Sequence, residues 1–284
     1  MKLIKTSFEI IEQEAGLEGV HKQIEKVGRT CYKSENLIKE DSAKPFVDRM
    51  IASKHYAMVE HGTLYFRIPC NIDVAANFLD EISTWTKCKH IVCSEGNWWA
   101  VTTNLRVMVE HFAPEYMEEL IAKYLCEPTK FHARRVTVKF TCDRGVSHEF
   151  VRHRVFSFAQ ESTRYCNYSK DKFGNELTYI LPCWWKDEEG NEAEAEFCNS
   201  LQYAEEQYFF LLSQGWTPQQ ARAVLPNSLK TELVMTGFVD DWEHFFSLRT
   251  SIIAETGKPH PQASELADPL YNEFIMRGYM EPLV

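Results

Sequence analysis

The sequence predicts an α+β fold that forms a single domain over residues 1–284. Two runs rich in β-formers, TLYFRI (63–68) and RRVTVKFT (134–141), lie far apart in the chain. The segments between and after them have the apolar spacing of amphipathic helices. No internal repeat, low-complexity tract or composition shift divides the chain, so we expect no domain boundary.

The first half predicts elements of both kinds. SFEIIEQEAGLEGVHKQIEKVGR (7–29) predicts a short strand and then a helix that ends near Gly28. DSAKPFVDRMIAS (41–53) predicts a helix capped by Asp41 or Ser42. TLYFRI predicts a strand that stops at Pro69. Residues 73–125 mostly indicate helices, among them DVAANFLDEISTW (73–85) and NWWAVTTNLRVMVEHF (97–112).

The second half begins with the strand RRVTVKFT and a helix at RGVSHEFVRHR (144–154). KDKFGNELTYILP (170–182) indicates a hairpin or loop, and Asn191 followed by Glu194 indicates the cap of a long helix that runs to Gly215. Thr217 and Pro218 start a short helix that Pro226 closes. LKTELVMTGF (229–238) predicts a strand, and DDWEHFFSLRTSIIAET (240–256) predicts a helix.

Composition excludes several classes of protein. The formal net charge of −10 argues against a general nucleic-acid binder, which carries a broad basic face. No apolar run is long enough for a membrane helix. The first residues, MKLIKTSFEIIEQEAG, contain no continuous apolar stretch, so we expect a cytoplasmic protein. The nine cysteines are scattered singly, which favours reduced thiols. CKHIVC (88–93) resembles half a zinc site without a second half, so no metal is expected.

Positive charge gathers in one place, RHRVFSFAQESTRY (152–165). Arginine and histidine near a helix C-terminus interact favourably with its dipole, which explains one or two of these charges. It does not explain Arg164 or the hydroxyls of Ser157, Ser162 and Thr163. Guanidinium forks with hydroxyl donors suit a phosphate or a flavin pyrophosphate. The chain has no GxGxxG and no GxxxxGK[ST], so arginines and hydroxyls must hold any nucleotide.

A second arginine stands where an apolar residue is expected. In the helix at 240–256, Trp242, Phe245 and Phe246 mark the apolar stripe, and Arg249 lies on that same stripe, which Ile252 and Ile253 continue. A guanidinium in apolar surroundings needs an anion or several acceptors. Three interpretations remain open: a buried pair with a carboxylate such as Glu232, an arginine that snorkels at an interface, or a bound anion or polar heterocycle. Arg222 lies inside the small-apolar run ARAVLP and also has two interpretations. It is either an ordinary exposed arginine of a helix or an arginine that binds an anion.

Three blocks of the sequence together resemble the flavin-dependent thymidylate synthases. Arg152-His153-Arg154, seven residues and then Ser162 fits the signature of that family without a gap. EHGTLYF (60–66) is similar to its Glu-His strand. ARAVLP, followed 27 residues after its arginine by the arginine of SLR (222 to 249), is similar to its C-terminal half. The similarity covers residues 55–66 and 134–255, and 67–133 resembles an insertion of a divergent branch.

The resemblance implies an enzyme that makes dTMP by reductive methylation of dUMP. Methylenetetrahydrofolate would donate the carbon, and NADPH would supply the hydride through FAD. The implied fold is a central antiparallel sheet flanked by helices, in a homotetramer whose active sites are shared between subunits. No membrane and no nucleic-acid partner are expected.

The resemblance also implies roles for individual residues. Arg249 is the expected catalytic residue, which contacts the uracil ring and favours ionisation at N3. Arg222 is expected to reach the dUMP site from another subunit. The positions implied for FAD are His61, Thr63, Arg152, His153, Arg154, Gln160 and His244. The positions implied for dUMP are Glu149, Arg152, Gln160, Glu161, Ser162, Thr163, Arg164, Arg222 and Arg249.

Some positions depart from the family pattern. Glu149 stands where the family usually has a glutamine, and Gln160 where it usually has a glutamate. The FAD segment before the last helix reads GFVDD (237–241), and Ile253 replaces a histidine. His244 replaces an asparagine and is expected to substitute for it in part, with His260 a weaker candidate.

Two other functions stay open on the sequence. Cys166 in RYCNYS is a candidate nucleophile for a thiol mechanism of the kind used by folate-only thymidylate synthases. A non-catalytic flavin-, nucleotide- or RNA-binding relative is the other alternative. Ser162 is better interpreted as a phosphate ligand than as a nucleophile, because no general base stands next to it.

Overall fold

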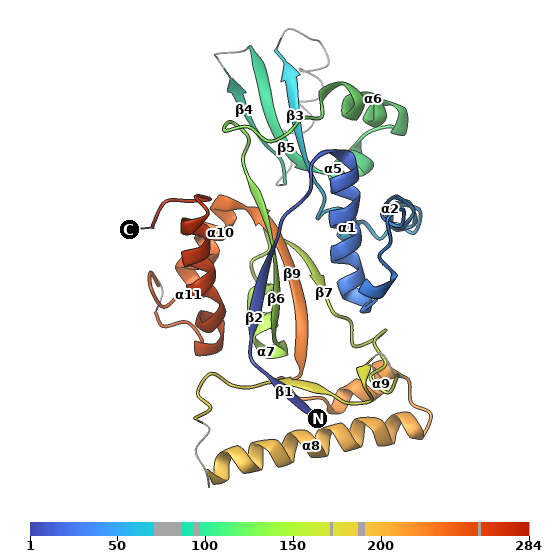
Figure 1. The fold of residues 1–284 in the computed structure, drawn as a ribbon, viewed down its shortest axis with the longest axis vertical. Helices are drawn as coiled ribbons and strands as arrows, with labels where there is room; N and C mark the ends of the chain where they lie inside the picture. The colour runs from blue at the N-terminus through green and yellow to red at the C-terminus, as the bar shows by residue number, and fades with distance from the viewer. Residues whose placement is uncertain (71–86, 94–96, 171–172, 187–190, 255–256, 284) are drawn as a thin grey trace.

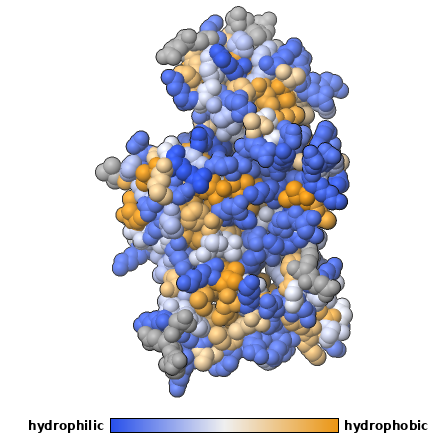
Figure 2. Space-filling model, viewed as in Figure 1, coloured by the Kyte–Doolittle hydropathy of each residue, from blue (hydrophilic) through white to orange (hydrophobic). Residues whose placement is uncertain are grey.

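The computed structural model describes residues 1–70, 87–93, 97–170, 173–186, 191–254 and 257–283. The described part is elongated (Figure 1). A four-stranded sheet between helices occupies the middle, a three-stranded sheet lies at one end, and the helix α8 (Glu192–Ser213) crosses the other end. Hydrophilic side chains cover most of the face in Figure 2, with hydrophobic residues in patches between them.

The central sheet is antiparallel and has the strand order β2-β6-β9-β7. Its strands are β2 (Ser7–Ile11), β6 (Arg135–Asp143), β9 (Lys230–Phe238) and β7 (Ser157–Gln160). β6 and β9 pair along their whole lengths, from Arg135 opposite Phe238 to Asp143 opposite Lys230. The expected α+β class is confirmed, and so are the strands predicted at 134–141 and 229–238.

Helices cover both faces of this sheet. α7 (Arg144–Phe150), α10 (Val239–Arg249) and α11 (Pro261–Met276) pack on one face, against alternate residues of β6 such as Val138 and Phe140. On the other face, α1 (Gly16–Tyr32) and α3 (Tyr56–Val59) pack against Ile11, Ala159 and Val234. α2 (Ala43–Ala52) lies against α1, which continues past the predicted end at Gly28. A Cβ at Gly28 would lie 2.6 Å from the Phe46 ring, so the glycine lets α2 approach.

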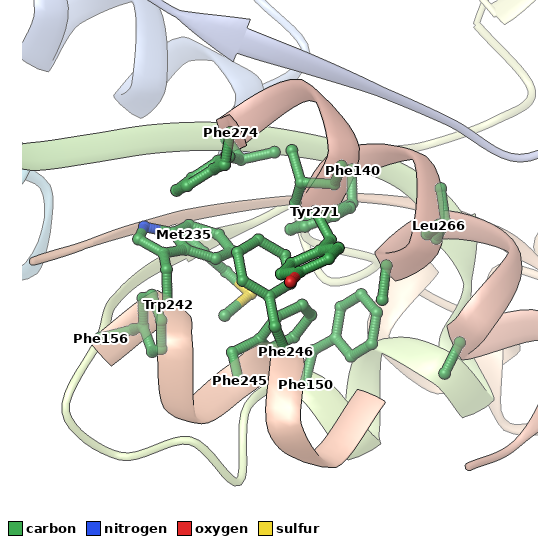
Figure 3. Close-up of a cluster of buried hydrophobic side chains, with 14 of the residues drawn as sticks. Phe140, Phe150, Phe156, Met235, Trp242, Phe245, Phe246, Leu266, Tyr271 and Phe274 are labelled. Atoms are coloured by element: carbon green, nitrogen blue, oxygen red, sulfur yellow. The ribbon is translucent and has the colours of Figure 1, made fainter. Parts of the chain in front are cut away.

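The larger core is aromatic (Figure 3). Trp242, Phe245 and Phe246 are completely buried, which confirms the predicted stripe of α10. The prediction that this helix reaches residue 256 is wrong, because α10 ends at Arg249 and Ile252 is exposed. The Thr250 hydroxyl donates to the Phe246 carbonyl at 2.8 Å, a side-chain bond that competes with continued helix.

The three-stranded sheet has the order β3-β5-β4, with β3 (Thr63–Pro69), β5 (Trp98–Asn104) and β4 (Lys89–Cys93). The strand at TLYFRI is confirmed, but the helix predicted over 97–112 is wrong in its first half. Aromatic and β-branched residues of β5 suit a strand that pairs on both sides. The Asn104 side chain then caps α5 (Leu105–His111), which precedes α6 (Pro114–Tyr124). The helix predicted at 73–85 lies outside the described residues.

At the other end, β1 (Lys2–Ile4) pairs in parallel with β8 (Thr178–Ile180). The hairpin predicted at 170–182 therefore holds a strand whose partner is the N-terminal segment. The predicted cap is confirmed, because Asn191 Oδ1 accepts from the N–H groups of Ala193 and Glu194 at the start of α8. The remaining short elements are α9 (Pro218–Ala221) and the 3₁₀ turns Glu35–Leu37 and Arg222–Val224. Among the described helices, none is both long and apolar enough to span a membrane.

Candidate active site

A tight turn at 151–156 joins α7 to β7 and carries the arginine-histidine-arginine motif. The helix predicted over 144–154 ends at Phe150, and the His153 N–H donates to the Phe150 carbonyl at 3.1 Å. His153 is 6% exposed and its ring packs on Phe156 and Phe245. Its neighbours Arg152 and Arg154 are exposed. The turn therefore buries one imidazole and presents two guanidinium groups to solvent.

Arg249 meets this turn from the end of α10. Its Nη1 donates to Glu149 Oε2 at 2.6 Å, its Nη2 to the Glu149 carbonyl at 3.1 Å, and its Nε to His153 Nε2 at 3.1 Å. The side chain is 16% exposed. Burial lowers the pKa of Arg249, Glu149 opposes the shift, and the charge of Arg152 adds to it. Of the five N–H donors of a guanidinium, two are left for a ligand by the contacts within the described residues.

The carboxylate partner of Arg249 differs from the one considered on sequence grounds. Glu232 instead accepts from Lys33 at 2.8 Å and from Lys230 at 2.9 Å. Burial alone raises the pKa of Glu232, but the two lysines outweigh it and lower the pKa to about 2. The pairing with Glu232 is therefore wrong, because both lysines satisfy that carboxylate on β9 while α10 ends beside α7.

His153 is held in one neutral tautomer. Its Nε2 accepts from Arg249 Nε, so the ring proton lies on Nδ1. Burial, the positive charge of Arg249 and the nearby His244 lower the pKa of His153 to about 4. The His153 and His244 rings lie 6.0 Å apart between centroids. The structure thus brings together five of the predicted site residues: Glu149, Arg152, His153, His244 and Arg249.

We expect the stability of the protein to fall as the pH falls from 6.5 toward 4. His153 stays neutral in the folded state down to about pH 4, whereas an unfolded chain takes up its proton near pH 6.5. Between pH 6.5 and pH 4, His153 therefore lowers the free energy of unfolding by up to about 1.4 kcal/mol for each unit by which the pH falls. Urea unfolding between pH 6.5 and 5 measures the slope, which we expect to be smaller in His153→Gln.

The matched control for this slope is His148→Gln, because His148 is exposed on the preceding helix α7. The control keeps the wild-type slope. A His153→Gln variant with an unchanged slope would show that the buried ring does not take part in the acid response.

A second group of predicted residues lies around the segment 160–165. Arg222 Nη1 donates to Thr163 Oγ1 at 3.1 Å. Both residues line a pocket of about 250 Å³ together with Arg144, Ala223, Leu225 and Leu229. Arg222 was expected to arrive from another subunit, but it reaches Thr163 within one protomer. The reason is local, since the turn after α9 returns the chain to β9 beside this segment.

Gln160 and Glu161, which lie between these two groups, are held by hydrogen bonds to other side chains of the protein. Gln160 Nε2 donates to Ser147 Oγ on α7 at 2.9 Å and to Thr231 Oγ1 at 3.2 Å. Glu161 is buried and accepts from Tyr168 Oη at 3.0 Å and from Lys230 Nζ at 2.8 Å. These contacts occupy both oxygens of Glu161 and fix the path of the segment.

Ser162 and Arg164 lie at the outer edge of the same segment. The Ser162 N–H donates to the Cys31 carbonyl at 3.0 Å, which fastens the segment to the end of α1. Its hydroxyl accepts from the Arg164 N–H at 3.3 Å. Arg164 is exposed, with its guanidinium 5.5 Å from the Tyr165 ring centroid. The Ser162 hydroxyl and the Arg164 head group remain within reach of a ligand.

His61 and Thr63 do not join either group. His61 is completely buried, its Nδ1 lies 2.7 Å from Thr236 Oγ1, and burial lowers the pKa of its ring to about 3. Thr63 Oγ1 accepts from Arg135 Nη1 at 3.2 Å and is also buried. His61 is fully enclosed in one protomer, whereas Thr63 lines a pocket of about 150 Å³ with Gln13, Tyr65 and Arg135 among others. Their role as FAD ligands stays a prediction.

An ion cluster beside His61 was not anticipated from the sequence. The Glu60 carboxylate accepts from Ser157 Oγ at 2.6 Å, from Arg106 Nη1 at 2.8 Å and from Lys87. Burial tends to raise the pKa of Glu60, but these partners outweigh it and lower the pKa. The cluster ties the three-stranded sheet to β7, and its partners are too distant in sequence to form a motif.

The cysteines and His260 add little to the site. Cys166 is completely buried, so its thiol has no open path to a nucleotide. None of the nine cysteines forms a disulfide. His260 is exposed at the start of α11, with its ring 6.1 Å from that of Trp184. Within the described ranges, no three His, Cys, Asp or Glu side chains converge as a metal site.

Comparison with known proteins identifies the family. The family model described as thymidylate synthase complementing protein matches residues 97–275, which are 179 of the 284 residues. The chain belongs to this family. The match contains Arg249 with its partners Glu149 and His153, which we call the Arg249 group. It also contains the pocket lined by Arg222, and it excludes His61 and Thr63. The resemblance drawn from the arginine motif is confirmed.

Members of the family with curated names are similar over part of their length. A flavin-dependent thymidylate synthase of Pyrococcus horikoshii is 29% identical over 143 residues, 50% of this chain and 55% of that protein. The protein of the same name from Corynebacterium aurimucosum is 34% identical over 126 residues, 40% of this chain and 48% of that protein. The chain thus spans about half the length of these relatives.

A solved structure is similar over nearly the full chain. It is the UMP/dUMP methylase PolB of Streptomyces cacaoi bound with 5-Br dUMP, at 16% identity and a TM-score of 0.45, covering 99% of this chain and 100% of that one.

Proposed function

We propose that the protein is a flavin-dependent thymidylate synthase that converts dUMP to dTMP. Methylenetetrahydrofolate supplies the carbon and NADPH supplies the reducing equivalents through FAD. The observation that carries this proposal is the Arg249 group, in which an incompletely engaged guanidinium lies beside two exposed arginines. Family membership and the names of the relatives support it.

Arg249 activates the pyrimidine in this proposal. Carbon 5 of uracil becomes nucleophilic when N3 loses its proton, because the negative charge spreads over N3, O4 and C5. The two N–H groups of Arg249 that the described residues leave free stabilise that anion electrostatically. Glu149 and His153 fix the direction of the guanidinium, so it does not have to reorganise during the reaction.

The residues near the turn suit a flavin dinucleotide. Arg152 and Arg154 are exposed cations on one turn, and their positive charge suits the negative pyrophosphate of FAD. His244 lies near this turn, because its ring is close to that of His153. When bound, FAD supplies the hydride that reduces the transferred carbon to a methyl group. No thiolate of the chain is needed, which agrees with the burial of Cys166.

The segment 160–165 and Arg222 bind the phosphate and sugar of dUMP. Thr163, Ser162 and Arg164 supply hydroxyl and guanidinium donors, and Arg222 already contacts Thr163. Gln160 and Glu161 hold this segment in place. We further propose a single-domain, cytoplasmic homotetramer, in which neighbouring protomers complete the FAD site around the exposed Arg152 and Arg154.

The test is tritium release from C5 of labelled dUMP by protein stripped of flavin, with methylenetetrahydrofolate and NADPH, before and after addition of FAD. We expect release only with FAD, and the same rate in Cys166→Ala. Release that is indifferent to FAD but lost in Cys166→Ala would replace the proposal by a thiol mechanism. No release under any condition would leave a nucleotide-binding protein without turnover.

A further inference from the structure

Arg144, the first residue of α7, carries a guanidinium that the protein does not fully satisfy. Its Nη1 is buried and has no hydrogen-bond partner among the residues that the structure describes. The adjacent Asp143 is not its partner, because that carboxylate accepts from the Val146 N–H at 2.8 Å and from Gln262 Nε2 at 2.8 Å. A buried cationic donor without an acceptor is costly. An anion that binds here would remove that cost.

Arg144 lines the same pocket of about 250 Å³ as Thr163 and Arg222. The other walls are the apolar residues Ala223, Leu225 and Leu229, and no acidic residue of the described chain lines the pocket. Two arginines and one threonine therefore line a partly apolar space. Such a donor set fits a phosphate that carries nearly two negative charges at neutral pH.

We propose that Arg144 is a direct ligand of the 5′-phosphate of the nucleotide substrate, opposite Arg222. The identity of the nucleotide as dUMP rests on the function proposed above. Helix α7 supports the arrangement, because Glu149 lies five positions after Arg144, or about 7.5 Å along a helix axis. The phosphate end and the base end of one nucleotide then meet the two ends of one helix.

Calorimetric titration with dUMP and with deoxyuridine, which lacks the phosphate, tests this assignment. We expect Arg144→Gln to weaken dUMP binding by about 10- to 100-fold, as for loss of a charged hydrogen-bonding group, and to leave deoxyuridine binding unchanged. Arg144→Lys keeps the positive charge but not the forked pair of N–H donors, so we expect its dUMP affinity to lie between those of the wild type and Arg144→Gln. The matched control Arg277→Gln, which removes an exposed guanidinium at the end of α11, binds dUMP like the wild type.

Thermal unfolding shows whether Arg144→Gln is folded. We expect its ligand-free melting temperature to equal or exceed that of the wild type, since a buried N–H group without an acceptor in the described chain is gone. Unchanged dUMP affinity in this variant would overturn the assignment. So would an equal loss of deoxyuridine binding, or a change in sedimentation without a change in affinity, which would assign Arg144 to a contact with a second copy.

The two proposals fail separately. A wild type that binds dUMP in an Arg144-dependent way but releases no tritium would refute the synthase function and leave the phosphate ligand intact. A wild type that binds neither dUMP nor inorganic phosphate would overturn the assignment of Arg144.

Discussion

Replacing Arg249 by alanine lowers kcat/KM for dTMP formation by about 100- to 1,000-fold, the size of effect seen when a preorganised donor to a developing anion is removed. Arg249 is the guanidinium that the proposed mechanism places against the uracil, and Glu149 and His153 already hold it in position. A thousandfold loss equals about 4 kcal/mol of transition-state stabilisation. Steady-state kinetics with saturating FAD and NADPH measure it.

Two further variants show whether that loss comes from the guanidinium of Arg249 itself. Arg249→Lys keeps a positive charge but cannot reproduce three fixed N–H directions, so we expect it to recover only a small part of the activity. Arg277→Gln, in an exposed ion pair with Glu273, retains full activity. Far-ultraviolet circular dichroism checks that the inactive variants are folded. A folded Arg249→Ala enzyme with near-normal turnover would remove Arg249 from the chemistry.

Phe245→Ala destabilises the protein by about 3–5 kcal/mol, the range for truncating a buried phenylalanine. Phe245 is completely buried, with ring centroids 5.0 Å from Phe150 and 5.3 Å from Trp242. It also supports the His153 ring, with 5.1 Å between the centroids, so we expect the site to loosen with the core. The free energy of unfolding in urea measures the loss.

The control for this variant is Phe210→Ala, because Phe210 is 56% exposed on α8. We expect its unfolding free energy to change by less than about 0.5 kcal/mol. A loss below about 1 kcal/mol in Phe245→Ala would mean that the aromatic cluster repacks around the missing ring.

The sequence predicts the elements whose pattern is local. β6 alternates apolar and polar residues, β9 holds a short apolar run (Leu233–Met235), and Asn191 and Thr217 mark helix starts that the structure confirms. β5 was mistaken for a helix because Trp98–Asn104 is flanked by a true helix with the same apolar content. Its strand character comes from pairing with β3 and β4, and such long-range pairing leaves no signal within a short window.

The same limit applies to the candidate site. The position of Arg249 on an apolar stripe identified it as unusual, but its partner Glu149 lies 100 residues away and could not be found from spacing. Arg144 follows a strand in an unremarkable context, and only the fold shows that its Nη1 is buried without an acceptor among the described residues. His61 was predicted as an FAD ligand from a motif, and only the fold shows that its side chain is completely buried within one protomer, so that role stays a prediction.

The most direct test of the account is the identity of the folate product. Reducing the transferred carbon to a methyl group takes two electrons, and either the flavin or the folate itself must supply them. In a reaction with dUMP, methylenetetrahydrofolate, NADPH and FAD, we predict that chromatography finds one tetrahydrofolate for each dTMP formed. Dihydrofolate in that amount would contradict the account, because the folate would then be the reductant and the flavin site would have no part in the chemistry.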